Sequence, residues 1–194
     1  MKILVIGGGG REHAIVWGLN RSERVDHVIC APGNAGIAEI AEIRDIAVAD
    51  HDRLVRLGRD EAVSLVVIGP EDPLAAGLAD RFAAAGIPVA SPSAAATRIE
   101  SSKAWAKELM LESGVPTAQA VAVQTRDDGI NAIFDLADEH GGVVIKADGL
   151  AGGKGVVVAD STADAIQALD ALITGKALGD AGTTVVVEER MSGM

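Results

Sequence analysis

The chain has 194 residues, of which 48% are hydrophobic and 23% charged, enough to bury a core in one large domain or a domain and a half. Its formal net charge of -11 disfavours a nucleic-acid partner, because a polyphosphate surface repels an acidic body. Apolar runs stay far short of the roughly 20 residues that span a bilayer, and the single Cys30 cannot form an internal disulfide. We therefore expect a cytoplasmic protein with no membrane partner.

The first hundred residues predict alternating strands and helices. Continuously apolar segments are strand candidates, and the segments between them have helical spacing of apolar residues. The strand candidates lie at 2–6, 27–31, 65–69 and 87–91, and the helix candidates at about 12–20, 51–60 and 74–85. Strands without polar alternation are buried on both faces, which is typical of a parallel sheet covered by helices. Residues 1–100 thus predict an α/β domain with an open parallel sheet of the doubly wound type.

The second half of the chain has a different order of elements. Pro92 precedes a short predicted helix, the Ser101–Ser102 pair can cap the next one, and Gly114 and Pro116 end it, so we expect a hinge here. The elements expected beyond it are a strand at 119–124, a helix at 127–140, a strand at 142–147, a glycine turn, a strand at 155–159, a helix at 162–174 and a strand at 183–189. An antiparallel hairpin around the glycines favours a small α+β domain at 101–194, incomplete at its C-terminus.

The first glycine cluster, GGGGREH at 7–13, follows an apolar strand and opens a helix. Backbone N–H groups at the start of a helix form a site for an anion. The dinucleotide fingerprint requires a glycine where this chain has Glu12 or His13. The pattern favours a phosphate on a small substrate, with a glycine turn that only packs strand against helix as the alternative.

The second glycine cluster lies in VVIKADGLAGGKGVVVA, residues 143–159. Gly155 follows Lys154 where a P-loop has a magnesium-binding Ser or Thr, so a Walker-type NTPase fits poorly. The pattern indicates a hairpin tip that can fold over phosphates, with Lys154 at the tip and Lys146 on the incoming strand. A turn without a ligand is the alternative.

Six segments, in order along the chain, resemble the N-terminal portion of the glycinamide ribonucleotide synthetase (phosphoribosylamine-glycine ligase) family of the ATP-grasp superfamily. They are GGGGREHAI (7–15), APGNAG (31–36), GPEDPLAAGLAD (69–80), SPSAAATRIESSKAWAK (91–107), VVIKADGLAGGKGVVVA (143–159) and VVVEE (185–189). The resemblance implies a pre-ATP-grasp domain followed by a partial ATP-grasp domain.

The resemblance also implies two sets of site residues. Those implied to bind 5-phosphoribosylamine are Gly9, Gly10, Arg11, Asn34 and Glu71. Those implied to bind ATP are Lys103, Lys146, Gly149, Gly152, Gly153, Lys154, Gly155, Glu188 and Glu189, with Lys146 and Lys154 also catalytic. The Mg²⁺ or Mn²⁺ ligands of the family lie beyond residue 194, so no metal ligand is expected within this chain.

The implied reaction is the ATP-dependent ligation of glycine to 5-phosphoribosylamine, through glycyl phosphate, in de novo purine biosynthesis. The products are glycinamide ribonucleotide, ADP and phosphate, and a monomer or weak dimer is expected. Two alternatives stay open: another ATP-grasp carboxylate ligase, and a non-catalytic nucleotide-binding fragment. The PGNAG and GPE stretches favour the first reaction over the other ligases.

Overall fold

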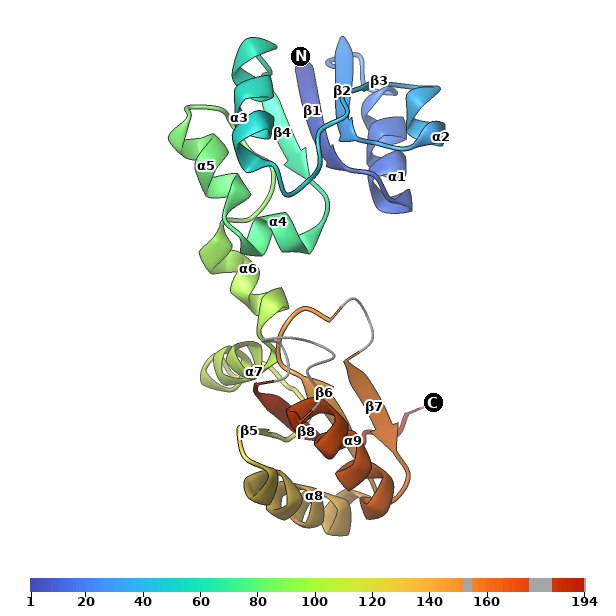
Figure 1. Ribbon diagram of the computed structural model, residues 1–194, viewed down its shortest axis with the longest axis vertical. Coiled ribbons are helices and arrows are strands. Elements are labelled where there is room, and N and C mark those ends of the chain that lie inside the picture. The colour runs from blue at the N-terminus through green and yellow to red at the C-terminus, as the bar shows by residue number, and fades with distance from the viewer. Residues whose placement is uncertain (152–154, 175–182, 194) are drawn as a thin grey trace. The chain divides into compact units, whose positions relative to one another are not determined.

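The computed structural model describes residues 1–151, 155–174 and 183–193 (Figure 1). Contacts within the chain divide it into two compact units, Met1–Thr97 and Arg98–Met194, called unit 1 and unit 2. Unit 1 contains a parallel sheet and unit 2 an antiparallel one, which confirms the predicted fold class. None of the helices in the described ranges combines the length and apolar character needed to cross a bilayer.

Unit 1 is built on four parallel strands in the order β3-β2-β1-β4. The strands are β1 (Lys2–Gly7), β2 (His27–Pro32), β3 (Glu42–Ile43) and β4 (Leu65–Ile68). The helices are α1 (Gly10–Leu19), α2 (Ala35–Ala38), α3 (His51–Asp60), α4 (Glu71–Ala75) and α5 (Leu78–Ala84), and α6 (Ala94–Ser101) begins in this unit. The short elements β3 and α2 were not predicted.

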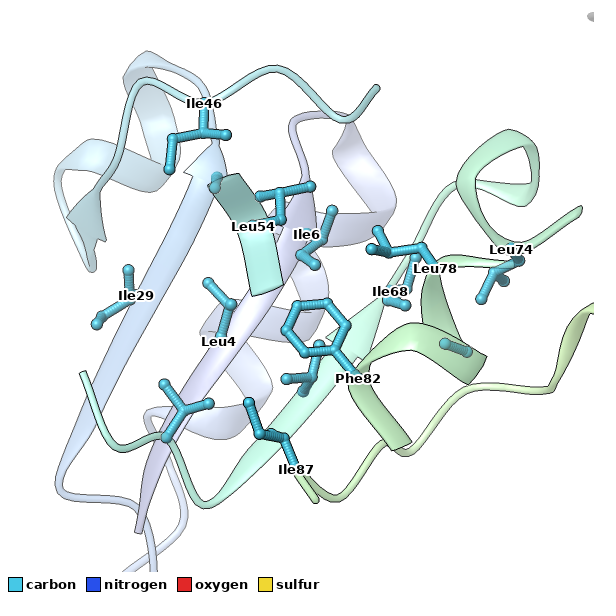
Figure 2. Close-up of a cluster of buried hydrophobic side chains, with 14 residues drawn as sticks. Leu4, Ile6, Ile29, Ile46, Leu54, Ile68, Leu74, Leu78, Phe82 and Ile87 are labelled. Atoms are coloured by element: carbon cyan, nitrogen blue, oxygen red, sulfur yellow. The ribbon is translucent and has the colours of Figure 1, made fainter. Parts of the chain in front are cut away.

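Helices cover both faces of this sheet because successive residues of β1 point to opposite sides. Leu4 lies on the face covered by α3 and α5, where Phe82 is fully buried among strand residues (Figure 2). Ile3 lies on the other face and packs with Val16 of α1. Burying a side chain of this size contributes about 1.5–3 kcal/mol, so the two faces together fix the strands in place.

The strand predicted at 87–91 is wrong, since this segment forms a single parallel bridge between Val66 and Val89. Pro88 has no N–H to donate to a ladder. Further along, the hydroxyl of Ser91 accepts the N–H of Ile68 at 2.8 Å and donates to its carbonyl at 3.1 Å. A side chain therefore takes the hydrogen bonds that a continuing strand would have made.

The helix predicted at about 74–85 is two helices, α4 and α5. Gly77 separates them with φ at +83°, a left-handed conformation that glycine adopts without steric cost. The apolar spacing across 74–85 did not reveal this break, because it is similar on both sides of the glycine.

Unit 2 contains an antiparallel sheet in the order β5-β8-β6-β7. Its strands are β5 (Ala120–Val123), β6 (Val143–Ala147), β7 (Val156–Ala159) and β8 (Val185–Glu189), and its helices are α7 (Lys103–Glu112), α8 (Arg126–His140) and α9 (Thr162–Thr174). The predicted hairpin is confirmed, with Lys146 of β6 paired with Val156 of β7. Ser102 accepts the N–H of Trp105 and caps α7, also as predicted.

Helices α8 and α9 pack against one face of this sheet (Figure 1). Ile133 of α8 and Leu169 of α9 share a core with Ile145 of β6 and Val187 of β8. Because side chains alternate along a strand, the neighbouring residues Lys146 and Glu188 point to the opposite face. The sheet thus has one apolar, helix-covered face and one face that carries charges.

Candidate active site

Unit 1 gathers polar groups at the carboxyl ends of β1, β2 and β4. The chain passes from β1 to β2 on one side and later returns to β4 on the other side, so the strand order reverses at β1 (Figure 1). Ligands of open α/β sheets bind in the crevice at such a switch point. The predicted residues Gly9, Gly10 and Arg11 follow β1, Asn34 follows β2 and Glu71 follows β4, so all five lie at this edge.

Asn34 has both ends of its amide occupied within the protein. Its Oδ1 accepts the N–H of Ile37 at 2.9 Å and caps α2, and its Nδ2 donates to the carbonyl of Gly8 at 2.9 Å. Gly8 in turn lies so close to the next loop that an added Cβ would be 2.4 Å from the carbonyl oxygen of Gly33. Asn34 therefore ties the loop after β2 to the glycine turn after β1.

Arg11 links the turn to the loop after β4. Its Nε donates to Oε1 of Glu12 at 2.8 Å, and one terminal nitrogen lies 3.4 Å from Oε2 of Glu71. The hydrogen bond with Glu12 is the main cause that raises the pKa of Arg11. With 57% of its side chain exposed, Arg11 keeps guanidinium hydrogens on the solvent side that an anionic ligand can accept.

A second cluster lies on the charged face of the unit 2 sheet. Glu188 is 5% exposed, and its carboxylate has a lysine at each oxygen, with Lys146 Nζ at 2.8 Å from Oε1 and Lys107 Nζ at 3.3 Å from Oε2. Lys107 also donates to the hydroxyl of Thr117 at 2.8 Å and to the carbonyl of Ala118 at 2.9 Å. Two cations around one carboxylate leave a local charge of +1.

The two lysines of this cluster differ in what they can still bind. An ammonium group has three hydrogens to donate, and Lys107 donates two of them to Thr117 and Ala118 in addition to its ion pair with Glu188. Lys146 has Glu188 as its one partner within the described residues, and its side chain is a quarter exposed. Lys146 therefore has hydrogens left for an anion such as a phosphate.

Lys103 is the first residue of α7, and its side chain contacts the residues at which the glycine-rich segment begins. Its Nζ donates to the carbonyls of Asp148 at 3.3 Å and Gly149 at 3.1 Å. Asp148 accepts the N–H of Ala104 at 2.7 Å, so a carboxylate sits at the N-terminus of α7, where the helix dipole favours negative charge. These bonds fasten the residues after β6 to the helix that carries Lys103 and Lys107.

The remaining predicted ATP-binding residues divide into three groups. Gly155 is buried, and its carbonyl accepts the N–H of Ala147 at 2.7 Å in the hairpin. Glu189 has its side chain on the helix-covered side of the sheet, where Oε1 accepts the N–H of Gln119 at 2.8 Å, so it is not part of the Glu188 cluster. Gly152, Gly153 and Lys154 lie outside the described residues.

Two family models together match the whole chain. Phosphoribosylglycinamide synthetase, N domain, matches residues 1–100, and phosphoribosylglycinamide synthetase, ATP-grasp (A) domain, matches residues 101–194. The chain belongs to the phosphoribosylglycinamide synthetase family.

Curated relatives of this family support the same grouping. The chain is 49% identical over its full length to a phosphoribosylamine-glycine ligase of Xylella fastidiosa, and 42% identical over 99% of its length to one of Rhodopirellula baltica. In both comparisons the match covers 45% of the relative. The chain thus spans a little under half the length of these members of the family.

Solved structures show the same fold. A crystal structure of phosphoribosylamine-glycine ligase from Thermotoga maritima has a TM-score of 0.78 and 27% identity, and the match covers all of this chain and 45% of that one. The biotin carboxylase domain of a Hydrogenobacter thermophilus 2-oxoglutarate carboxylase, in complex with MgADP, has a TM-score of 0.74 at 19% identity, covering 98% of this chain and 44% of that one. At that identity the second likeness extends to the fold alone.

The described residues do not fit a divalent metal ion. Within ranges 1–151, 155–174 and 183–193, no three His, Cys, Asp or Glu side chains are grouped so that they could hold one. Glu188, the buried carboxylate of unit 2, already has a lysine at each oxygen.

Three charged residues described above were not predicted as site residues: Glu12, Lys107 and Asp148. Lys107 could have been found from its spacing, because it follows Lys103 by four positions and so shares a face of the helix. Glu12 follows the helix-capping Gly9 by three positions, the spacing at which a glutamate reaches back to the cap N–H. Asp148 had no such local signal, since its partners lie on α7.

Proposed function

We propose that the protein that contains this chain joins glycine to 5-phosphoribosylamine at the expense of ATP, giving glycinamide ribonucleotide, ADP and phosphate in de novo purine biosynthesis. Family membership supports the reaction, since the relatives carry the name phosphoribosylamine-glycine ligase. The observation that carries the ATP half is the Lys107–Glu188–Lys146 cluster, in which Lys146 is left with hydrogens to donate. Residues 101–194 are the proposed ATP-grasp domain.

In this mechanism a carboxylate oxygen of glycine attacks the γ-phosphorus of ATP, and the bond to the ADP oxygen breaks. The amine of 5-phosphoribosylamine then attacks the acyl carbon of glycyl phosphate and phosphate leaves. No protein nucleophile is needed, so the protein contributes alignment, charge neutralisation and exclusion of water. Lys146 would donate to a phosphate, and Lys103 would do so from the start of α7.

The proposed flap over the phosphates consists of Gly149, Gly152, Gly153, Lys154 and Gly155. One contact supports part of this role: Nζ of Lys103 donates to the carbonyl of Gly149, at the start of the proposed flap. In the complete enzyme, Lys154→Met should cost about 1.5–3 kcal/mol in the transition state, the range for a hydrogen bond to a charged group, or roughly ten- to a hundredfold in rate. Steady-state turnover at saturating ATP measures this loss, and a rate within about twofold of the original would refute the flap role.

The first 100 residues are the proposed binding domain for 5-phosphoribosylamine, with Gly9, Gly10, Arg11, Asn34 and Glu71 at its site. Their common place at the switch point of the sheet supports this. Mg²⁺ or Mn²⁺ is the proposed cofactor and would add positive charge at the phosphates when bound. The proposal also includes a cytoplasmic location and a monomer or weak dimer. By resemblance to the family, Glu188 and Glu189 are further proposed to lie at the adenine and ribose end of ATP.

Calorimetric titration of the 194-residue chain with ATP and Mg²⁺ tests the ATP half. Lys146→Met should weaken binding about ten- to a hundredfold, because it removes a charged hydrogen bond. Lys2→Met is the matched control, since Lys2 pairs with Glu61 in unit 1, and it should leave the affinity within twofold. Equal affinities for Lys146→Met and the original chain would refute the role of Lys146.

A product assay with glycine, 5-phosphoribosylamine and ATP distinguishes the alternatives. Glycinamide ribonucleotide as product supports the ligase. ATP binding with no product supports the non-catalytic nucleotide-binding fragment. ATP hydrolysis that depends on a different carboxylate, such as bicarbonate, supports another ATP-grasp ligase.

A further inference from the structure

Glu12 is a buried carboxylate that the proposed reaction does not use. It is 3% exposed, and a carboxylate in such a place is tolerated only when hydrogen bonds compensate for lost water. Its Oε2 accepts the N–H of Gly9 at 2.6 Å and its Oε1 accepts Nε of Arg11 at 2.8 Å. Both donors belong to the turn or helix start that was predicted to bind substrate.

The surrounding backbone leaves room for this one side chain. A Cβ added to Gly69 would lie 2.0 Å from Oε1 of Glu12, and one added to Gly7 would lie 2.6 Å from its Cγ. Gly69 is not among the glycines with positive φ, so its lack of a side chain is explained by space and not by backbone conformation. Glu12 thus packs against Gly7 and Gly69 at the ends of β1 and β4, next to the switch point of the sheet.

This arrangement differs from that of a dinucleotide site. The dinucleotide fingerprint has a small glycine at the position of Glu12, and the N–H groups of its turn approach the pyrophosphate. In this chain the N–H of Gly9 donates to the carboxylate of Glu12 and is not available to a pyrophosphate. The same carboxylate holds the guanidinium of Arg11, which also approaches Glu71.

We propose that Glu12 is a positioning residue of the unit 1 substrate site: it holds Arg11 and the glycine turn in place against the loop after β4, and Arg11 supplies the contact with the sugar phosphate. The proposal rests on the proposed function of unit 1. It differs from a purely structural role because Glu12 then acts through Arg11, so its removal should affect the ligand of unit 1 and leave ATP binding unchanged.

The test is titration of the 194-residue chain with ribose 5-phosphate, a stable probe for the sugar phosphate of 5-phosphoribosylamine. Glu12→Gln should weaken ribose 5-phosphate binding at least tenfold and leave ATP affinity within twofold. Glu39→Gln, at an exposed position after α2, is the matched control and should change neither affinity. Gly69→Ala is a second route to the same loss, because its methyl group displaces the Glu12 carboxylate without removing the charge.

A double-mutant cycle separates positioning from structure. Arg11→Met alone should weaken ribose 5-phosphate binding at least tenfold, and adding Glu12→Gln should weaken it no further, because Glu12 acts through Arg11. Additive losses, or a Glu12→Gln chain that melts earlier yet binds ribose 5-phosphate within twofold of the original, would overturn the positioning role alone. If the original chain binds ATP but not ribose 5-phosphate, both the proposed substrate role of unit 1 and the positioning role of Glu12 are wrong.

Discussion

Among the residues whose burial the structure describes, each unit buries one glutamate, and the two glutamates are stabilised in different ways. Glu12 of unit 1 is held by the N–H of Gly9 and by Arg11, both within three positions of it in the sequence. Glu188 of unit 2 is held by Lys146 from another strand and Lys107 from a helix. The first arrangement is local, whereas the second exists only when the tertiary structure has formed.

This difference separates two ways of presenting charge. In unit 1 the carboxylate is matched by one exposed arginine and a backbone N–H group, so the turn is held in one conformation. In unit 2 two lysine cations flank one carboxylate, so this cluster leaves a net positive charge on the face of the sheet that α8 and α9 do not cover. We infer that the first cluster is built for position and the second for attraction of an anion.

The largest expected effect comes from breaking the unit 2 cluster at Lys107. Lys107→Met removes one of the two cations beside buried Glu188 and leaves Thr117 and the carbonyl of Ala118 without their donor. Removing one partner of a buried ion pair costs about 3–5 kcal/mol. Urea unfolding of the chain, followed by Trp105 fluorescence in a Trp17→Phe background, measures this loss in unit 2.

The control for Lys107 is another lysine-glutamate pair in the same chain. Lys2 binds Glu61 at 2.9 Å on the surface of unit 1, and exposed pairs contribute at most about 1 kcal/mol. Lys2→Met should therefore have a small effect. Similar losses for the two substitutions would show that Glu188 is solvated in solution and that the contrast between the units is wrong.

The next effect concerns Cys30, which lies below the glycine turn with Sγ 3.4 Å from the carbonyl oxygen of Gly7. Burial, and secondarily the negative charge of Glu12, raises the pKa of Cys30 to about 11. The thiol of the unfolded chain ionises near pH 8.5, so between about pH 9 and 11 the unfolded state loses its proton first. Stability of unit 1 should therefore fall by about 2–3 kcal/mol as the pH rises through this window.

Comparison with Cys30→Ala isolates this dependence, because the variant lacks the thiol and keeps every other titrating group. Urea unfolding followed by Trp17 fluorescence in a Trp105→Phe background should show a steeper alkaline loss for the original chain. Glu12→Gln should reduce the difference, since it removes a charge that opposes thiolate formation. Parallel stability profiles for the original chain and Cys30→Ala would contradict a buried thiol next to a charged Glu12.

The sequence predicted the features that depend on local patterns. Apolar strands, the helix at 51–60 and the glycine hairpin follow from periodicity and turn residues, and the structure contains them. The sequence did not predict that Ser91 would end the strand pairing of 87–91. That end depends on hydrogen bonds between the Ser91 hydroxyl and the backbone of Ile68 in the neighbouring strand.

For the candidate sites, the sequence named Lys146 and Glu188 but gave no reason for their contact. That contact depends on strand register, in which Lys146 pairs with Val186 and so lies diagonal to Glu188. Asp148 was missed for the same physical reason, since its partners lie on α7 and a long-range partner leaves no periodic trace in the sequence. Asn34 was predicted as a substrate ligand. Its role as the N-cap of α2 could also have been predicted, because asparagine is a favoured residue just before a helix.

The smallest expected effect comes from substitution of Asn34. It distinguishes a structural role of this side chain from direct contact with the substrate. Asn34→Ala removes the cap of α2 and the bond to Gly8, and loss of an N-cap costs about 1 kcal/mol. Asn34→Asp keeps a capping oxygen and loses only the donor to Gly8, so it should be less destabilised in urea unfolding. If Asn34→Ala is as stable as the original chain yet loses ribose 5-phosphate binding, Asn34 contacts the substrate directly. Asn34 would then be a ligand of the sugar phosphate beside Arg11, and not a residue that only holds the turn in place.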